Sequence, residues 1–356
     1  MNKKILILPG DGIGKEVTKE GKKVLEKIAV KFGHHFEYDI ATIGHEAIEL
    51  SGNPLPDESL VKMKNCDAIL FGAVGHPKYD NDPSSKVRPE QGLLKMRKEL
   101  GLYANLRPIK LFDELLGASS IKPEILKGAD ILFFRELTGD VYFGERGRKE
   151  EGNTAFDTMI YSRYEVERIA HKAFKAAMTR RKKVTSVDKA NVLESSRLWR
   201  EVIQEVAKQY PEVEVEHQFV DSTAMLLIKN PKAFDVVVTG NLFGDILTDE
   251  ASQIAGSMGM LASASIGDGV GLYEPIHGSA HDITGKGLAN PLASILSVAL
   301  MLDISFGLKE ESENVIKAIE KVLKEGFRTK DIADAQTLSD KILNTENMGT
   351  KVVESL

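Results

Sequence analysis

"FDVVVTGNLFGDILTDEASQ" (residues 234–253) places a short apolar strand, centred on Val237, directly before a helix that carries Asp245 and Asp249. Residues four positions apart share one helix face, with Cβ atoms about 5–6 Å apart, so these two carboxylates repel each other. One interpretation is a solvated helical turn, in which carboxylates interact favourably with the positive end of the helix dipole. The other is a cation site at the carboxyl end of a buried strand, where open α/β sheets bind their ligands. This stretch alone leaves both interpretations open.

Strands and amphipathic helices alternate along most of the chain, which is typical of a largely parallel α/β sheet. The pattern predicts strands at residues 3–10, 66–75, 182–189 and 213–220, and helices at 15–33, 163–181, 195–210 and 309–326. Three further strands are expected at 103–111, 129–137 and 140–145. We therefore predict an α/β fold of two domains, in which residues 1–102 plus 256–356 form the first and residues 103–255 form an inserted second domain.

The glycine turn "PGDGIG" (residues 9–14) follows the first predicted strand and resembles a dinucleotide-binding fingerprint. The motif G-x-G-x-x-G would need a third glycine at position 15, which is Lys15 in this chain. The glycines that are present, Gly10, Gly12 and Gly14, still permit a tight turn and a close approach of ligand. The sheet is therefore not expected to be a standard Rossmann fold.

Composition and charge exclude several classes of protein. The chain has 356 residues, enough for two full cores, and its 42% hydrophobic and 28% charged content is ordinary for a globular protein. A net charge of −6, with no basic run interleaved with aromatic residues, argues against a nucleic-acid partner. The single cysteine, Cys66, excludes an internal disulfide and fits a reducing compartment.

Two apolar stretches are too short to be targeting or membrane segments. The run in "MNKKILILPGDG" ends after four residues and is too short for a signal peptide. The stretch "PLASILSVALMLDISFG" (residues 291–307) is interrupted by Asp303 and is too short to span a bilayer, so it predicts a core or interface helix. We expect a cytoplasmic protein with no membrane partner.

Arginines at separate predicted strand and helix ends indicate an anionic substrate. Arg97, Arg107 and Arg135 lie in "LLKMRKELGLYANLRP" and "FFRELTGDVYFG", and Tyr142 lies in the second of these segments. A guanidinium group is a planar fork matched to carboxylates, so several of them favour a dicarboxylate or tricarboxylate substrate. The alternative for each arginine taken singly is a structural ion pair.

Lys189 and Asp221 each follow a predicted strand. A desolvated lysine can serve in proton transfer, and the alternative for Lys189 is an ordinary surface lysine. Asp221 has a helix N-cap as its alternative role. Taken together, Asp221, Asp245 and Asp249 would make a hard oxygen site suited to Mg²⁺ or Mn²⁺.

Six colinear segments carry a resemblance to a known family. They are "LPGDGIGKEV", "RPEQGLLKMRKELGLYANLRP", "RELTGDVYFGE", "VDKANVLE", "FDVVVTGNLFGDILTDEAS" and "YEPIHGSAHDITGKGLANP". The chain resembles the β-decarboxylating dehydrogenases over nearly its whole length, and within that family it is most similar to the 3-isopropylmalate dehydrogenases. The resemblance implies their two-domain fold, a homodimer with sites shared between subunits, and metal-dependent oxidative decarboxylation of 3-isopropylmalate with NAD⁺ in leucine biosynthesis.

The resemblance also implies roles for the residues singled out above. Asp245 and Asp249, with Asp221 supplied by the partner subunit, would hold Mg²⁺ or Mn²⁺ against the substrate hydroxyl and its adjacent carboxylate. Lys189, also from the partner subunit, would take part in deprotonating that hydroxyl, and Tyr142 would help to protonate the enol carbon. The three arginines, Arg97, Arg107 and Arg135, would grip the malate carboxylates.

The segment "EPIHGSAHDITGKGLAN" would form the cofactor loop, although a Gly-rich loop taken alone is simply a connector. The residues implied to line the NAD site are Glu274, His277, Gly278, Ala280, Asp282 and Asn290. Asp282 favours NAD over NADP because its carboxylate can accept hydrogen bonds from ribose hydroxyls and would repel a 2′-phosphate.

Glu90, Leu93 and Leu94 lie one or two helical turns before Arg97, and the two leucines suit an isopropyl group. Their alternative role is ordinary helix core, and tartrate or D-malate dehydrogenases of the family can also be apolar here. The chain departs from the usual family pattern at His76, where glycine is common, and at His281, where proline is common. A non-catalytic regulatory subunit is the alternative from another class, but such a subunit should lack part of the metal and lysine set, which this chain retains in full.

Overall fold

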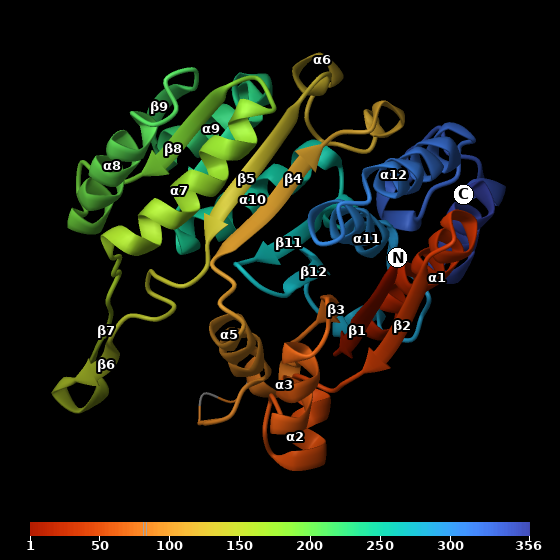
Figure 1. The fold of residues 1–356 in the computed structure, drawn as a ribbon, viewed down its shortest axis with the longest axis horizontal. Helices are drawn as coiled ribbons and strands as arrows, with labels where there is room; N and C mark the ends of the chain where they lie inside the picture. Colours follow the sequence, from red (N-terminus) through yellow and green to blue (C-terminus); the bar gives the residue numbers. More distant parts are fainter. Residues whose placement is uncertain (81, 83) are drawn as a thin grey trace. The chain divides into compact units, whose positions relative to one another are not determined.

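The computed structural model describes residues 1–80, 82 and 84–356 (Figure 1). The chain forms two compact units. The first unit comprises Met1–Leu102, Phe112–Ser120 and Ala255–Leu356, and the second unit comprises Tyr103–Leu111 and Ile121–Ile254. The functional domain limits expected from the sequence, at residues 102 and 256, stay a prediction.

Five strands form the sheet of the first unit, in the order β2-β1-β3-β12-β11. Their bounds are β1 (Asn2–Gly10), β2 (His35–Ile40), β3 (Ala68–Ala73), β11 (Ala262–Ile266) and β12 (Gly271–Pro275). All of the adjacent pairs are parallel except β11 with β12. Ile5, Leu6 and Leu8 of β1 are all fully buried, because a parallel strand that is covered on both faces reads as a continuous apolar run.

The long helices of the first unit are α1 (Gly14–Phe32), α11 (Leu292–Ile304), α12 (Lys309–Lys324) and α13 (Thr345–Ser355). Shorter helices are α2 (His45–Ser51), α3 (Asp57–Lys64), α4 (Pro77–Asp80) and α5 (Pro89–Glu99). Helix α11 packs against α1, α12 and the strands β11 and β12. Leu292, Val298 and Leu302 of α11 are fully buried, so the apolar stretch at residues 291–307 is a core helix of this unit.

Two glycines of the turn after β1 are required by close packing of the chain. Gly10 and Gly12 have left-handed φ values of 65° and 56°. A Cβ at Gly10 would lie 1.9 Å from the Ala73 carbonyl oxygen, and one at Gly12 would lie 1.9 Å from that of Ser279. The turn therefore joins β1 to β3 and to the loop after β12, and its glycines serve this close backbone approach.

The sheet of the second unit has the strand order β4-β5-β10-β8-β9. The bounds are β4 (Ala104–Lys110), β5 (Asp130–Glu136), β8 (Lys183–Asp188), β9 (Glu214–Phe219) and β10 (Val236–Thr239). Only β4 runs antiparallel to its neighbour β5. Thr239 at the end of β10 is in register with Arg135 of β5 and with Val187 of β8, so the carboxyl ends of these strands meet at one edge. Ligands of open α/β sheets bind at that edge.

The helices of the second unit are α6 (Pro123–Leu126), α7 (Arg163–Met178), α8 (Glu194–Ala207), α9 (Val220–Lys229) and α10 (Asn241–Ala255). Helix α7 begins with a capping box, in which Ser162 accepts from the Glu165 amide and Glu165 accepts from Ser162. It packs across β5 and β10 (Figure 1). A separate antiparallel pair, β6 (Arg146–Lys149) and β7 (Thr154–Asp157), follows the main strands in this unit.

The prediction of a strand at residues 140–145 is wrong. These residues form turns, because Asp140 has a left-handed φ of 74° and its carbonyl oxygen accepts from the Gly144 amide at 3.1 Å. The α/β class and the largely parallel sheet are confirmed. None of the helices in the described part of the chain is both long and apolar enough to cross a membrane.

Candidate active site

Asp245, which lies one turn into α10, is the centre of a cluster of polar side chains in the second unit. Its Oδ1 contacts Arg135 Nη1 and lies 3.4 Å from Arg107 Nη2. Its Oδ2 accepts a hydrogen bond of 2.8 Å from Tyr142 Oη. Two predicted substrate arginines, one predicted metal ligand and the predicted catalytic tyrosine are therefore brought together within one unit.

Both arginines are buried and held by neutral side chains as well as by Asp245. Arg135 is 3% exposed, and its Nε donates to Asn241 Oδ1 at 3.0 Å. Arg107 is 6% exposed, and its guanidinium donates to Asn105 and Thr248. Buried guanidinium groups with fixed geometry are suited to the recognition of an anionic ligand. Sequence reasoning missed the neutral partners, since an isolated Asn or Thr carries no signal of this role.

Asp249 lies on the same face of α10 as Asp245, and Arg107 Nη1 is 3.8 Å from its carboxylate. Burial raises the pKa of Asp249, and the neighbouring Asp245 carboxylate raises it further, against the opposite effect of Arg107. Asp249 is thus a partly buried carboxylate with a like charge on the same helix face and an arginine beside it. Magnesium is commonly bound by one or two carboxylates, with substrate and water supplying its other oxygen ligands, so this donor set fits a hard divalent cation.

Tyr142 is half-buried beside this pair, and its ring lies 5.6 Å from the Arg135 guanidinium carbon. Burial raises the pKa of Tyr142, and the adjacent Asp245 carboxylate adds to the effect because it disfavours a second negative charge. The phenol therefore keeps its proton at neutral pH and can act as a proton donor.

Lys189 and Asp221 form a second cluster in the same unit. Lys189 Nζ donates to Asp221 Oδ1 at 2.6 Å, and this bond lowers the pKa of Asp221. Hydrogen bonds fix the backbone at Lys189. The Lys189 amide donates to Ser196 Oγ, and both carboxylate oxygens of the preceding Asp188 accept from Arg200. Within the described residues of one chain, no group of three or more His, Cys, Asp or Glu side chains could hold a metal. Asp221 therefore does not join Asp245 and Asp249 in a single copy.

The predicted substrate residues of α5 lie in the first unit. Arg97 is 8% exposed, and its Nη2 lies 3.3 Å from Glu274 Oε1, so a predicted substrate residue is paired with a predicted cofactor residue. Leu93 packs against the core cluster that contains Met96, whereas Leu94 is half-buried outside that cluster. Glu90 is exposed. The structure thus separates the two leucines into a core face and a second face of the same helix.

The predicted cofactor loop follows β12 in the first unit. His277 Nε2 is buried and has no hydrogen-bond partner among the described residues, and burial lowers the pKa of His277. A buried nitrogen with no partner fits a ligand that would supply one. Ala280 has a left-handed φ of 39°, and a Cβ at Gly278 would meet no atom within 4 Å. Asp282 is exposed, as its predicted role requires.

Asn290 already serves a structural purpose. Its Oδ1 accepts from the Leu292 amide at 3.0 Å and so satisfies the first turn of α11. Its Nδ2 donates to Asp331 at 3.0 Å. Asn290 therefore shapes the end of the loop through its own hydrogen bonds, and its predicted contact with a cofactor stays a prediction.

The family model described as isocitrate/isopropylmalate dehydrogenase matches residues 4–352. The chain belongs to this family. The match covers both units and every predicted site residue, so the isocitrate/isopropylmalate dehydrogenase family accounts for the α/β fold and for its interrupted first unit.

Similar members of the isocitrate/isopropylmalate dehydrogenase family span the same length. The 3-isopropylmalate dehydrogenase of Rhodopirellula baltica is 57% identical over 360 residues, covering 100% of this chain and 99% of that protein. The Aquifex aeolicus 3-isopropylmalate dehydrogenase is 52% identical, covering 99% and 97%. The crystal structure of isocitrate dehydrogenase from Methylococcus capsulatus superposes with a TM-score of 0.88 at 33% identity, covering 99% of each chain.

His76 and His281, which the sequence resemblance predicts to be departures from the family pattern, lie in one cluster of the first unit. His76 lies between His45 and His281, with its ring tilted by 35° to that of His45 at a centroid distance of 3.9 Å and edge-on to that of His281 at 4.4 Å. His281 Nε2 is 2.7 Å from the Gly75 carbonyl oxygen, and His45 Nδ1 is 3.2 Å from Tyr79 Oη. The cluster ties the predicted cofactor loop to the turn after β3. The sequence shows each departure singly but not that the histidines meet.

Proposed function

We propose that this family member is an NAD-dependent 3-isopropylmalate dehydrogenase of leucine biosynthesis. It oxidises (2R,3S)-3-isopropylmalate and releases CO₂, giving 4-methyl-2-oxopentanoate and NADH. The observation that carries the reaction class is the cluster in which two buried arginines and Tyr142 surround Asp245 beside a second carboxylate. The full-length identity to curated 3-isopropylmalate dehydrogenases supports the particular substrate.

In this proposal, Asp245 and Asp249 hold Mg²⁺ or Mn²⁺, with Asp221 of a second copy completing the protein ligands. The bound cation would supply Lewis acidity to the substrate hydroxyl and to the oxygen that carries charge after CO₂ leaves. Arg107 and Arg135 neutralise the substrate carboxylates from buried, fixed positions, which is consistent with their low exposure. Arg97 takes the same role from the first unit.

Two residues move protons. Lys189 takes part in removing the hydroxyl proton, and the Asp221 carboxylate, which accepts from Lys189 Nζ at 2.6 Å, holds the half-buried lysine side chain in place. Tyr142 returns a proton to the carbon that loses CO₂, which is consistent with a raised phenol pKa that keeps this proton in place until it is needed.

The cofactor is proposed to bind the loop at residues 274–290, with His277 facing the adenine and Asp282 accepting from the ribose hydroxyls. The buried, unpartnered Nε2 of His277 among the described residues supports the first contact. The exposed carboxylate of Asp282 supports NAD over NADP, because a 2′-phosphate there would be repelled.

The proposed assembly is a homodimer that shares its active sites. Large apolar side chains are exposed in the second unit at Val192 (62%), Met225 (66%) and Ile246 (58%). Met225 and Ile246 lie on α9 and α10, the helices that carry Asp221 and Asp245, so a partner chain in contact with these helices would cover both apolar side chains. This placement supports a partner that brings Lys189 and Asp221 to the other copy's Asp245.

The test compares turnover of 3-isopropylmalate, D-malate, tartrate and isocitrate with NAD⁺, followed by NADH absorbance. We expect the highest kcat/KM for 3-isopropylmalate. A higher kcat/KM for D-malate or tartrate would replace the substrate assignment. Absence of turnover with all four substrates in the presence of Mg²⁺ or Mn²⁺ would contradict the enzyme assignment and favour a non-catalytic subunit.

A further inference from the structure

Asp140 is an unusual residue in the loop that presents Tyr142. Its backbone is left-handed, with a φ of 74°, and the residue is only 1% exposed. Left-handed backbone is uncommon outside glycine, although Asp and Asn tolerate it best, and burying a carboxylate carries a further cost. An arrangement that costs free energy twice persists only where the surrounding structure holds it, so the partners of Asp140 indicate its purpose.

The Asp140 carboxylate binds its own loop and the beginning of α10. Its Oδ1 accepts from the Val141 amide at 2.7 Å. Its Oδ2 accepts from the Leu242 amide at 3.1 Å and from Tyr161 Oη at 3.1 Å. The first amides of a helix have no partner within the helix, and negative charge is favoured at that end. Asp140 therefore caps α10 from a loop about 100 positions away in the chain.

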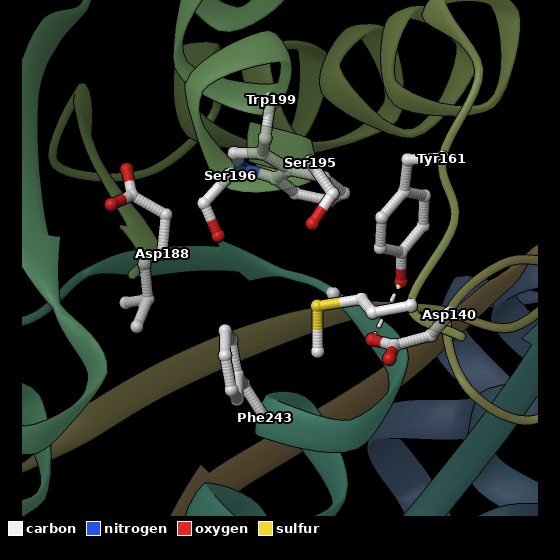
Figure 2. A pocket seen from close by; sticks show the side chains of 10 residues that line it. Asp140, Tyr161, Asp188, Ser195, Ser196, Trp199 and Phe243 are labelled. Atoms are coloured by element: carbon white, nitrogen blue, oxygen red, sulfur yellow. Dashed lines mark hydrogen bonds between the residues drawn. The ribbon is translucent and has the colours of Figure 1, made fainter. Parts of the chain in front are cut away.

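Tyr161 extends this cap to the next amide. Its hydroxyl accepts from the Asn241 amide at 2.7 Å. The same hydroxyl donates to Asp140 at 3.1 Å (Figure 2). Burial raises the pKa of Tyr161 well above its ordinary value, and the nearby Asp140 carboxylate adds to this, so the donated proton is retained. The ring packs edge-on against Trp199, with centroids 5.3 Å apart, beside a small pocket that Phe243 also lines (Figure 2).

The two segments joined in this way carry the two partners of the central hydrogen bond. Tyr142 follows Asp140 by two positions, and Asp245 lies one turn along α10 from Asn241. The Asn241 side chain also accepts from Arg135 Nε at 3.0 Å. A shift of the α10 N-terminus relative to the loop would therefore disturb Tyr142, Asp245 and Arg135 together.

We propose that Asp140 is a positioning residue, which acts with Tyr161 to lock the Tyr142 loop onto the first turn of α10 and so sets the Tyr142–Asp245 geometry. This inference rests on the proposed function, in which Tyr142 and Asp245 touch substrate or metal. Asp140 itself would touch neither the substrate nor the metal.

The principal test is Asp140→Gly, because glycine accepts the left-handed backbone and removes only the carboxylate. We expect the amides of Asn241 and Leu242 to lose protection in hydrogen exchange. We expect kcat to fall about 10-fold or more, because small misplacements of reacting groups lower the rate of the chemical step. The KM for NAD⁺ should stay unchanged, because the predicted cofactor loop belongs to the first unit. Retained protection, or lost protection with wild-type kcat, would overturn the proposal.

Tyr161→Phe tests the same lock without altering Asp140. It removes one hydroxyl, and we expect it to lower kcat and to expose the Asn241 amide. The matched control is Tyr210→Phe, which removes a hydroxyl from a partly buried hydrogen bond of 2.9 Å with His171 elsewhere in the same unit. Equal effects of the two substitutions on kcat would mean general loosening of the unit and would refute positioning.

Asp140→Asn is the rescue variant, because asparagine tolerates the left-handed backbone and keeps an acceptor for the Leu242 amide. Its kcat should lie between those of wild type and Asp140→Gly, and a kcat no higher than that of Asp140→Gly would count against the lock. Failure of the wild type to turn over 3-isopropylmalate would refute the proposed function alone. The exchange measurement would still decide whether Asp140 holds α10.

Discussion

Asp245 shows how one side chain can serve several others at the residue scale. A half-exposed carboxylate receives two guanidinium groups and one phenol, so the positive charge of Arg107 and Arg135 is partly compensated before any ligand binds. Removing one member of a charge pair leaves the other without its partner, which is costly here because both guanidinium groups are buried. Substitution of Asp245 is therefore expected to affect stability as well as activity.

Removal of divalent cations should abolish turnover, because the cation proposed to bind Asp245 and Asp249 would supply the Lewis acidity that the reaction needs. Excess EDTA should reduce NADH formation to background, and added Mg²⁺ or Mn²⁺ should restore it. The same EDTA treatment should leave the folded fraction, measured by circular dichroism, unchanged. Full rates in EDTA would exclude the metal assignment.

Asp282→Lys should reverse the preference between NAD⁺ and NADP⁺, because it exchanges an acceptor for ribose hydroxyls with a partner for the 2′-phosphate. The ratio of kcat/KM for the two cofactors measures this. The control is Asp340→Lys, which makes the same change of charge at another exposed aspartate of the first unit. An unchanged ratio in Asp282→Lys would show that another residue sets the preference.

At the scale of elements, α5 has two faces with different purposes. Leu93 faces the core of the first unit, together with Met96, while Leu94 lies outside that cluster. Leu93 therefore has a role in the core, and Leu94 is the better candidate for contact with the substrate.

Leu94→Ala should lower kcat/KM for 3-isopropylmalate relative to D-malate by about 1–3 kcal/mol of discrimination, because an apolar contact is lost. Leu93→Ala should instead lower the thermal midpoint, since it opens a gap against the core. Steady-state kinetics on both substrates and thermal unfolding of both variants separate these outcomes. Equal loss on the two substrates in Leu94→Ala would leave helix packing as its only role.

The histidine cluster makes the loop after β12 sensitive to acid. Burial lowers the pKa of His76 from its ordinary value of 6.5, and neighbouring His45 and His281 lower it further, while Asp11 opposes this. The unfolded chain therefore binds more protons at His76 than the folded chain does below about pH 6.5, so stability falls as the pH drops through that range.

His76→Gln should reduce this sensitivity. The fall in thermal midpoint between about pH 7.5 and about pH 5.5 should be smaller in His76→Gln than in wild type. His35→Gln serves as control, because it removes an imidazole whose side chain is 70% exposed. If the two variants show the same pH dependence, the cluster does not govern acid stability.

At the scale of the whole molecule, the candidate metal ligands of one chain fall into two separate clusters. Lys189 binds Asp221, and Asp245 binds the arginines and Tyr142. A homodimer that brings the first cluster of one copy to the second cluster of the other would give two complete sites related by two-fold symmetry.

Mixed dimers test this arrangement. Lys189→Ala and Asp245→Asn homodimers should each be nearly inactive, because each substitution damages both sites. Random exchange would make about half of the dimers mixed, each with one intact site, so equal mixing should restore about a quarter of wild-type activity. Subunit exchange is followed by native mass spectrometry. Absence of recovery after confirmed exchange would mean that each site is built within one chain.

The sequence by itself was sufficient for the α/β class, for most helices and strands, and for the candidate residues at strand ends. Those features depend on local periodicity and on polar residues directly after apolar strands, such as Asp245 after Val236–Val238, and both are visible in a short window. Long motifs then identified the family without any tertiary contact.

Only the tertiary structure decided which of these residues meet. Residues 140–145 form a turn instead of the predicted strand, because Leu242 and Tyr161 stabilise the left-handed Asp140. Both partners lie far from Asp140 in the sequence, so a short window of sequence does not show them. The packing of Leu93 rather than Leu94 on the core cluster and the placement of His76 between two other histidines also depend on chain packing. Such contacts join residues tens to hundreds of positions apart, so their free energy has no signature in local composition or spacing.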